Sequence, residues 1–113
     1  MTAWVKAIQE SDLEASEHIP EGHWIRYVSL EEAGNGMIFG MGRLESGEKV
    51  EHAHPEEEVF YVLRGRGVAV WEEGGTKHQA NLAPGTAFYK TPNVHHAIRN
   101  TGDEPLLGLA FKV

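Results

Sequence analysis

Short runs of apolar and β-branched residues recur along the chain, separated by turns rich in glycine and proline. In an extended segment Phe60 and Val62 share the face of Glu58, whereas Val59 and Tyr61 face the other way, which is the period of a half-buried strand. Long helical periods are absent between the runs. The pattern predicts an all-β protein with strands over 23–28, 37–44, 58–64, 67–72, 77–82, 86–90, 96–100 and 106–113.

The segments between these runs carry explicit signals for chain reversal. Glycine and proline combinations at 34–36, 45–47, 64–67, 73–75, 83–85 and 101–103 favour tight turns. Such closely spaced reversals predict antiparallel strands in a sandwich or barrel. One short helix is expected near the N-terminus, because residues 11–14 fit a capping box and Pro20 would end the helix that starts there. Residues 29–32 have the same form, but Gly34 comes at once after them and favours a turn.

The C-terminal run 106–111 is apolar on both faces of a strand. Such a strand needs cover on both sides, and the core of one small barrel covers only one. We therefore expect a homodimer formed through sheet edges or faces. The N-terminal segment with Trp4, Val5 and Ile8 is a second candidate for subunit contact, because a terminal strand can add to a neighbour's edge. The alternative is that these residues cover the bottom of the same barrel.

Composition narrows the class of protein further. A chain of 113 residues that is 41% hydrophobic can bury the core of one domain, so residues 1–113 are expected to form a single domain. Without cysteine, any metal must be held by nitrogen and oxygen. The net charge of −7 argues against binding to nucleic acid or to an anionic membrane surface. The sequence has no leader pattern and no apolar stretch of membrane-spanning length, so we expect a cytoplasmic protein.

The densest group of metal-binding residue types begins at His52 and His54. In a strand these two side chains point the same way, and Glu58 has the same parity. A third imidazole is available from His95 or His96, but adjacent strand residues face opposite sides, and spacing alone does not choose between them. Three imidazoles and one carboxylate would bind iron, manganese, nickel or zinc with open coordination positions, as a catalytic site requires.

Other residues are expected around this site. Phe60 and Val62, with the parity of Glu58, would line a pocket beside the metal. The two glutamates before Glu58, Glu56 and Glu57, are expected to be solvated, or one of them would orient a ligand imidazole from outside the coordination sphere. Four basic residues would bind a ligand carboxylate or phosphate if they point inward, although charged strand residues usually face water: Arg26, Arg43, Lys90 and Arg99. Three histidines without a partner at ligand spacing are expected at the surface or in packing: His18, His23 and His78.

Two spaced motifs include these metal-binding residue types. The first is His52-x-His54-x-x-x-Glu58 followed by Gly65, and the second is Pro84 and Pro92 followed by His96-x-x-x-Asn100. Both resemble motifs of the cupin superfamily. The resemblance implies a jelly roll, or double-stranded β-helix, with a divalent metal inside the barrel. It also implies the ligand set His52, His54, Glu58 and His96, since the match through Asn100 selects His96 over His95.

The resemblance assigns structural roles as well. Asn100 is a further candidate for the pocket lining, and Gly65 would end its strand in a turn that favours positive φ. Two departures affect loops rather than ligands. Gly47 precedes His52 by one residue fewer than is usual, and Thr86 stands where aspartate is frequent. They put in doubt only loop details and any role of that aspartate.

The residues define a metal-binding site, but they are compatible with several types of reaction. We expect a metal-dependent enzyme acting on a small polar metabolite: with iron a dioxygenase, and with manganese, nickel or zinc an isomerase or lyase that uses the ion as a Lewis acid. The alternative is a non-catalytic, metal-dependent binder of a small carboxylate or sugar. A purely structural metal site ranks last, because a site with open coordination positions stabilises a fold less than a fully coordinated one. Protonation of the imidazoles is expected to release the metal between about pH 7 and 5.

Overall fold

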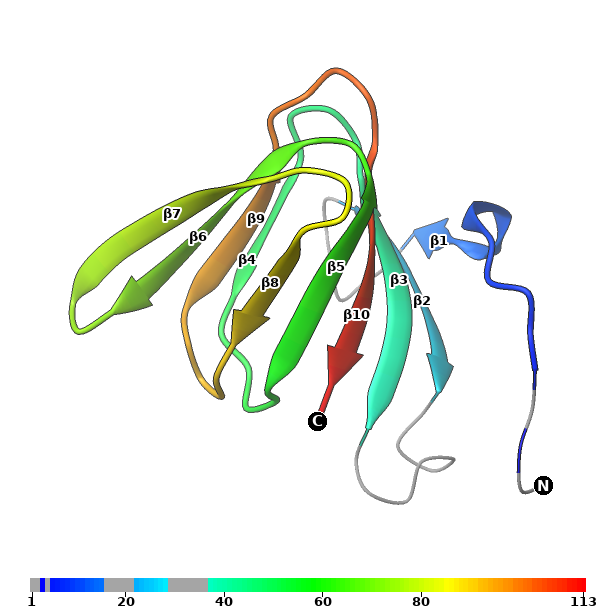
Figure 1. Ribbon diagram of the computed structural model, residues 1–113, viewed down its shortest axis with the longest axis horizontal. Coiled ribbons are helices and arrows are strands. Elements are labelled where there is room, and N and C mark those ends of the chain that lie inside the picture. The colour runs from blue at the N-terminus through cyan, green and yellow to red at the C-terminus, as the bar shows by residue number, and fades with distance from the viewer. Residues whose placement is uncertain (1–2, 4, 16–21, 29–36) are drawn as a thin grey trace.

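The computed structural model describes residues 3, 5–15, 22–28 and 37–113, and strands dominate them (Figure 1). The elements follow one another as η1 (Glu10–Asp12), β1 (Glu14–Ala15), β2 (Gly22–Val28), β3 (Ile38–Leu44), β4 (Lys49–His52), β5 (Glu58–Arg64), β6 (Gly67–Glu73), β7 (Thr76–Leu82), β8 (Ala87–Lys90), β9 (His96–Asn100) and β10 (Leu106–Lys112). The all-β prediction is confirmed, and the eight expected strands match β2, β3 and β5 to β10 within one residue at each end. The short strands β1 and β4 were not expected.

Two antiparallel sheets form the body of the molecule. The larger has the order β1-β2-β3-β10-β5-β8, and the smaller has the order β4-β9-β6-β7. They do not join into a closed barrel: Figure 1 shows the β6–β7 hairpin extending to one side, away from β1 and η1. Between the sheets lies a core to which β5 contributes Phe60 and Val62 and the smaller sheet contributes Ala69 and Ile98.

The alternation along β5 agrees with the sequence pattern. Glu58, Phe60 and Val62 are buried at 6%, 8% and 0% exposure, whereas Tyr61 and Leu63 are 41% and 42% exposed on the outer face. The face of β5 that carries Glu58 therefore points toward the interior. This places the one acidic residue of the strand inside the molecule, at the end where the loop after β4 enters β5.

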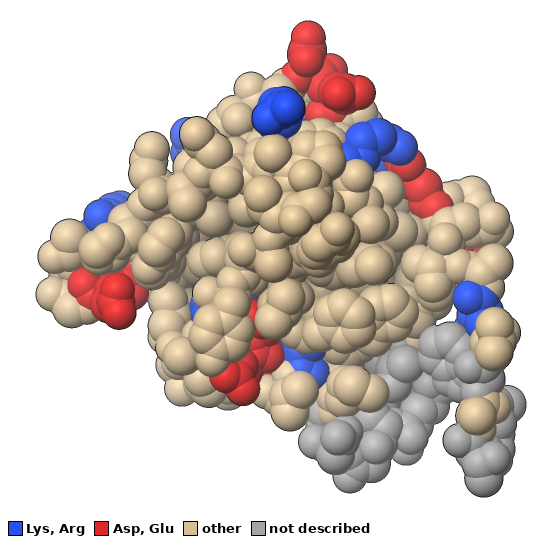
Figure 2. Space-filling model, in the orientation of Figure 1, with Lys and Arg blue, Asp and Glu red and all other residues tan. Residues whose placement is uncertain are grey.

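The outer face of the larger sheet is covered over only part of its width. Met41 and Leu107 form a second apolar cluster that the N-terminal residues Ile8 and Leu13 help to cover. For this part of the sheet the structure follows the alternative in which the chain covers its own sheet. Other apolar side chains of the sheet stay exposed: Tyr61, Leu63, Tyr89 and Phe111. Figure 2 shows a face of the molecule with few charges around a broad uncharged middle.

The expected N-terminal helix is wrong in kind and position. Residues Glu10–Asp12 form one 3-10 turn, and Glu14–Ala15 pair with β2 as a strand. The Asp12 carboxylate explains the early end, because it accepts hydrogen bonds from the Gln9 amide at 3.3 Å and from the Tyr27 hydroxyl at 2.7 Å and so ties the turn to the sheet. Among the described residues no helix is long and apolar enough to cross a membrane. The expectations for Pro20, 29–32 and 34–36 lie outside the described residues.

Two of the expected turns, at 64–67 and 83–85, are present. Gly65 joins β5 to β6 at φ +89°, and a Cβ atom there would lie 2.3 Å from the Pro105 carbonyl oxygen, so positive φ and close approach both require glycine. Thr86, which replaces the frequent aspartate, closes the turn before β8. Its hydroxyl accepts from the Ala83 amide at 3.1 Å and donates to the Ala83 carbonyl at 2.7 Å.

Candidate metal centre

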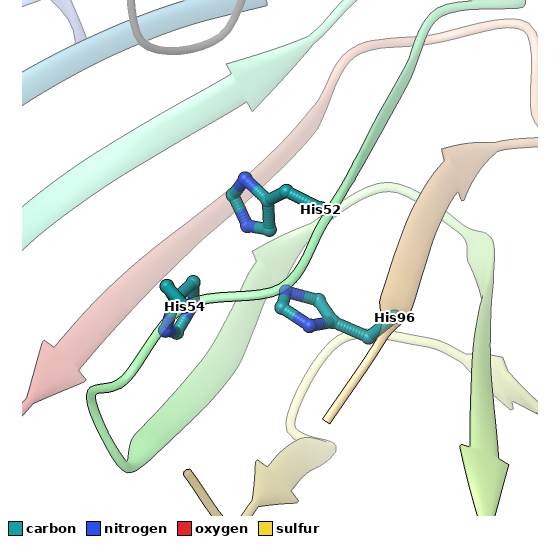
Figure 3. A group of neighbouring side chains, drawn as sticks. All are labelled: His52, His54 and His96. Atoms are coloured by element: carbon teal, nitrogen blue, oxygen red, sulfur yellow. The ribbon is translucent and has the colours of Figure 1, made fainter. Parts of the chain in front are cut away.

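Three imidazole rings meet at one end of the interior (Figure 3). His52 is the last residue of β4 and lies opposite His96, the first residue of β9. His54 comes two residues later, in the loop that leads to β5. The ring centroids are 4.6 to 5.1 Å apart, and one nitrogen from each ring lies within 4.8 Å of the others. The backbone therefore supplies three nitrogen donors at one point, as a divalent ion needs.

Hydrogen bonds orient two of these rings from behind. His96 Nδ1 lies 2.9 Å from the Val94 carbonyl oxygen, and His54 Nδ1 lies 3.1 Å from the Glu56 carbonyl oxygen. A carbonyl only accepts, so each Nδ1 carries the proton and donates it, leaving each Nε2 with a free lone pair. His54 Nε2 is buried and has no hydrogen-bond partner among the described residues. An unsatisfied acceptor facing two other imidazoles fits a metal ligand.

The acidic residues beside the histidines have separate roles. The Glu56 carboxylate lies 3.2 Å from His54 Nδ1, where it reinforces the orientation of that ring. Glu57 is exposed, and its carboxylate contacts the hydroxyl of Tyr89 instead. Of the two candidates for an outer orienting residue, Glu56 therefore has the required geometry.

Burial keeps the imidazoles neutral. It lowers the pKa of His96 to about 3 and the pKa of His52 to about 4, and it lowers the pKa of His54 as well. Neutral imidazole is the form that coordinates metal. These rings therefore take up protons only at lower pH than an exposed histidine does.

Glu58 lies at the edge of the histidine cluster. Its Oε1 atom is 3.4 Å from His54 Nε2, yet the same oxygen contacts the ammonium of Lys90, and Oε2 is 3.7 Å from the ammonium of Lys112. The group of converging donors comprises the three histidines. The structure thus brings Glu58 beside the expected centre with its carboxylate paired to two lysines.

The two adjacent histidines 95 and 96 separate clearly. His96 is 1% exposed in the interior, while the half-exposed His95 has its Nε2 atom 2.8 Å from a Glu51 carboxylate oxygen at the surface. His78 stacks on Trp71 with 5.7 Å between ring centroids, in keeping with a packing role. His23 is partly buried, and His18 lies outside the described residues.

The four basic candidates also take different positions. Arg43 pairs with Glu10 at 2.9 Å and with Glu45 at 2.8 Å, and Arg99 is exposed. The side chain of Arg26 is outside the described part. Lys90 points inward, with 3% exposure.

A cavity of about 50 Å³ adjoins His52 and His96. Its lining includes Phe60, as expected, with Val50 and Ile98 as further apolar walls. Two other expected lining residues do not border it. Val62 is fully buried in the core, and the Asn100 amide bonds to the backbone of Leu44 at the end of β3 and of Gly102 and Glu104 in the loop before β10.

Comparison with known families agrees with this architecture. The family model described as the cupin domain matches residues 40–111. The chain therefore belongs to the cupin family, and the matched segment contains all three converging histidines and Glu58. Comparison with curated proteins gives no match.

Solved structures similar to the chain are cupin barrels. A cupin 2 conserved barrel domain protein from Salinispora arenicola aligns at TM-score 0.74 with 18% identity, covering 97% of this chain and 87% of that one. A predicted oxalate decarboxylase from Thermotoga maritima aligns at TM-score 0.75 with 25% identity, covering 96% and 98%. Oxalate decarboxylase from Bacillus subtilis, which has Mn(II) centres, aligns at TM-score 0.72 with 21% identity. That alignment covers 82% of this chain and 25% of the Bacillus subtilis enzyme.

Proposed function

We propose that this cupin is a metal-dependent enzyme that acts on a small polar metabolite, with dioxygenase or isomerase and lyase chemistry. The observation that carries the proposal is the convergence of His52, His54 and His96, with ring nitrogens within 4.8 Å of one another. The orphaned Nε2 of His54 supports it, because a buried acceptor without a partner is costly unless something occupies its lone pair. The expected ligand Glu58 would complete the set when its carboxylate turns from the lysines.

The residues of the chain would divide the work. The three imidazoles would hold a divalent ion, and the carbonyls of Val94 and Glu56 would keep two of the rings in the coordinating tautomer. Such an ion supplies Lewis acidity or, if it is iron or manganese, redox chemistry. The apolar walls at Phe60 and Ile98 would exclude bulk water and limit the ligand to a few heavy atoms.

Elemental analysis of tag-free protein, combined with activity assays, tests the proposal. We expect about one divalent ion per chain, and turnover of at least one member of a panel of diols, keto acids and thiols followed by oxygen uptake and product analysis. Alanine at His52, His54 or His96 should remove metal and turnover together. Alanine at His95 is the matched control and should retain both, since that ring lies outside the cluster.

Failure of this experiment would be informative in two ways. Protein that never holds metal stoichiometrically would overturn the proposal. Protein that holds metal and binds small carboxylates or sugars without turnover would instead be a metal-dependent binding protein.

We also propose that the chain forms a homodimer through the exposed part of the larger sheet. The support is a set of apolar side chains that are 41 to 55% exposed on neighbouring strands: Tyr61, Leu63, Tyr89 and Phe111. Patches of this kind usually mark contact sites. Sedimentation at micromolar concentration should give twice the 12.5 kDa monomer mass, and lysine at Tyr61 should shift it to the monomer. A wild-type mass of one chain would contradict the dimer.

A further inference from the structure

A row of charge crosses the interior beside the histidines. Glu58 on β5 lies directly opposite Lys90 on β8 and directly opposite Lys112 on β10. Its two carboxylate oxygens contact the two ammonium groups, one on each side. Lys90 is 3% exposed, and lysine is almost never buried this fully unless it is paired. The Lys90–Glu58–Lys112 row is therefore a built feature of the interior.

The row carries more positive than negative charge. Lys90 and Lys112 contribute two positive charges and Glu58 one negative charge, and the nearby Glu56 carboxylate brings the local sum to zero (+2 − 2). A divalent ion at the histidines would raise that sum to +2. A dianionic ligand would restore the balance.

The row also stands between two hollows. The 50 Å³ cavity beside the histidines is bordered by Glu58 and Lys112. A larger hollow of about 420 Å³ opens between the β6–β7 hairpin and the end of β8, and Lys90 lines it together with the acidic residues Glu72 and Glu73. Each lysine of the row thus borders one of the two hollows.

We propose that Lys90 and Lys112 form the recognition site for a small dicarboxylate ligand, and that Glu58 holds its place while the ligand is absent. A carboxylate already lies between the two ammonium groups, so their spacing suits that group. When a metal ion at the histidines draws Glu58 to itself, the Glu58 carboxylate leaves both lysines, and a ligand carboxylate would take its place between them. Charge-assisted hydrogen bonds of this kind are the strong ones. This inference rests on the proposed metal site.

Calorimetry on zinc-loaded protein tests the inference with malonate and its neutral diamide, malonamide, as probes. We expect malonate to bind at least about tenfold more tightly than malonamide, since hydrogen bonds to charged groups are stronger than those to neutral groups. Lys90→Met should reduce malonate affinity by about tenfold or more and leave the zinc stoichiometry unchanged. Lys77→Met, at an exposed position of β7, is the matched control and should behave as the wild type.

Lys112→Met provides a second variant in case Lys90→Met does not fold, and it should also weaken malonate binding selectively. Equal affinity for malonate and malonamide, or wild-type malonate affinity in both methionine variants, would overturn the inference while leaving the metal site intact. Tighter binding of inorganic phosphate than of malonate would overturn the assignment to carboxylates. A wild-type protein that takes up no zinc would overturn the proposed function and this inference together.

Discussion

Strand β9 carries a buried polar side chain at each end, and the two ends use it in opposite ways. His96 and Asn100 lie four residues apart on the same face, and each is 1% exposed. The Asn100 amide donates to the carbonyls of Leu44 and Glu104 and accepts from the Gly102 amide, all within 2.9 Å. The His96 ring donates one hydrogen bond, from Nδ1 to a backbone carbonyl, and packs against the other two imidazole rings.

This contrast separates a structural polar group from a functional one. Asn100 has a partner for each part of its amide, so it ties the loop before β10 to the end of β3 and offers nothing to a ligand. At the histidine end, Nε2 of His54 is buried and has no hydrogen-bond partner among the described residues. Burial of an unsatisfied acceptor costs about 1–3 kcal/mol. A bound ion would remove this cost, so substitutions at the two ends should differ in kind.

The largest effect should come from Asn100→Ala. This change leaves two carbonyls and one amide without partners, and we expect it to lower the free energy of unfolding by on the order of 4 kcal/mol. Urea denaturation measures it. Asn81→Ala, on the exposed face of β7, is the control and should change the midpoint little. If Asn100→Ala folds normally but loses metal, Asn100 serves the metal site and the structural role given to its end of β9 is wrong.

His96→Ala should have the converse effect. We expect metal affinity to fall by at least about a hundredfold, since loss of an outer partner alone costs ten- to a hundredfold. The stability of the metal-free protein should fall much less than in Asn100→Ala. Metal titration followed by a chromophoric chelator provides the measurement. Undiminished metal affinity in this variant would remove His96 from the ligand set.

Acid should destabilise the metal-free protein through the same ring. The pKa of folded His96 is about 3 and its unfolded value is near 6.5, so between these limits the unfolded chain binds more protons and stability falls as pH falls. Replacement by glutamine should flatten this dependence by up to about 1.4 kcal/mol per pH unit below pH 6.5. Urea denaturation of chelator-treated protein at pH 7, 6 and 5 checks it. Identical slopes in variant and wild type would contradict the neutral, buried state of His96.

The smallest effect is expected at Glu56, which orients His54 without joining the cluster. Glu56→Gln removes the charge but keeps the backbone carbonyl, so metal affinity should fall only about tenfold. Glu57→Gln is the matched control, because that carboxylate contacts Tyr89 at the surface. Competition titration resolves the difference. A larger loss in the Glu57 variant than in the Glu56 variant would reverse the assigned roles.

Much of the architecture was predictable from local pattern. The alternation around Phe60 identified β5 and the residues sharing its inner face, and Gly65 marked the turn with positive φ. These features depend on near neighbours in sequence, because strand parity and glycine conformation are local properties. The N-terminal helix failed because a capping motif does not reveal that Asp12 bonds to Tyr27, a residue in another strand. The extent of the domain as residues 1–113 stays a prediction.

The sequence by itself determined that this protein is a β-strand cupin in which His52, His54 and Glu58 share one parity and the second motif supplies a further histidine. Tertiary structure decided which side chains each of these residues contacts. Pairing of β4 with β9 turns His96 inward, and pairing of β5 with both β8 and β10 sets Glu58 between two lysines. The physical reason is that a period of two tells which residues share a face, while only the register between distant strands chooses which side chains lie opposite one another.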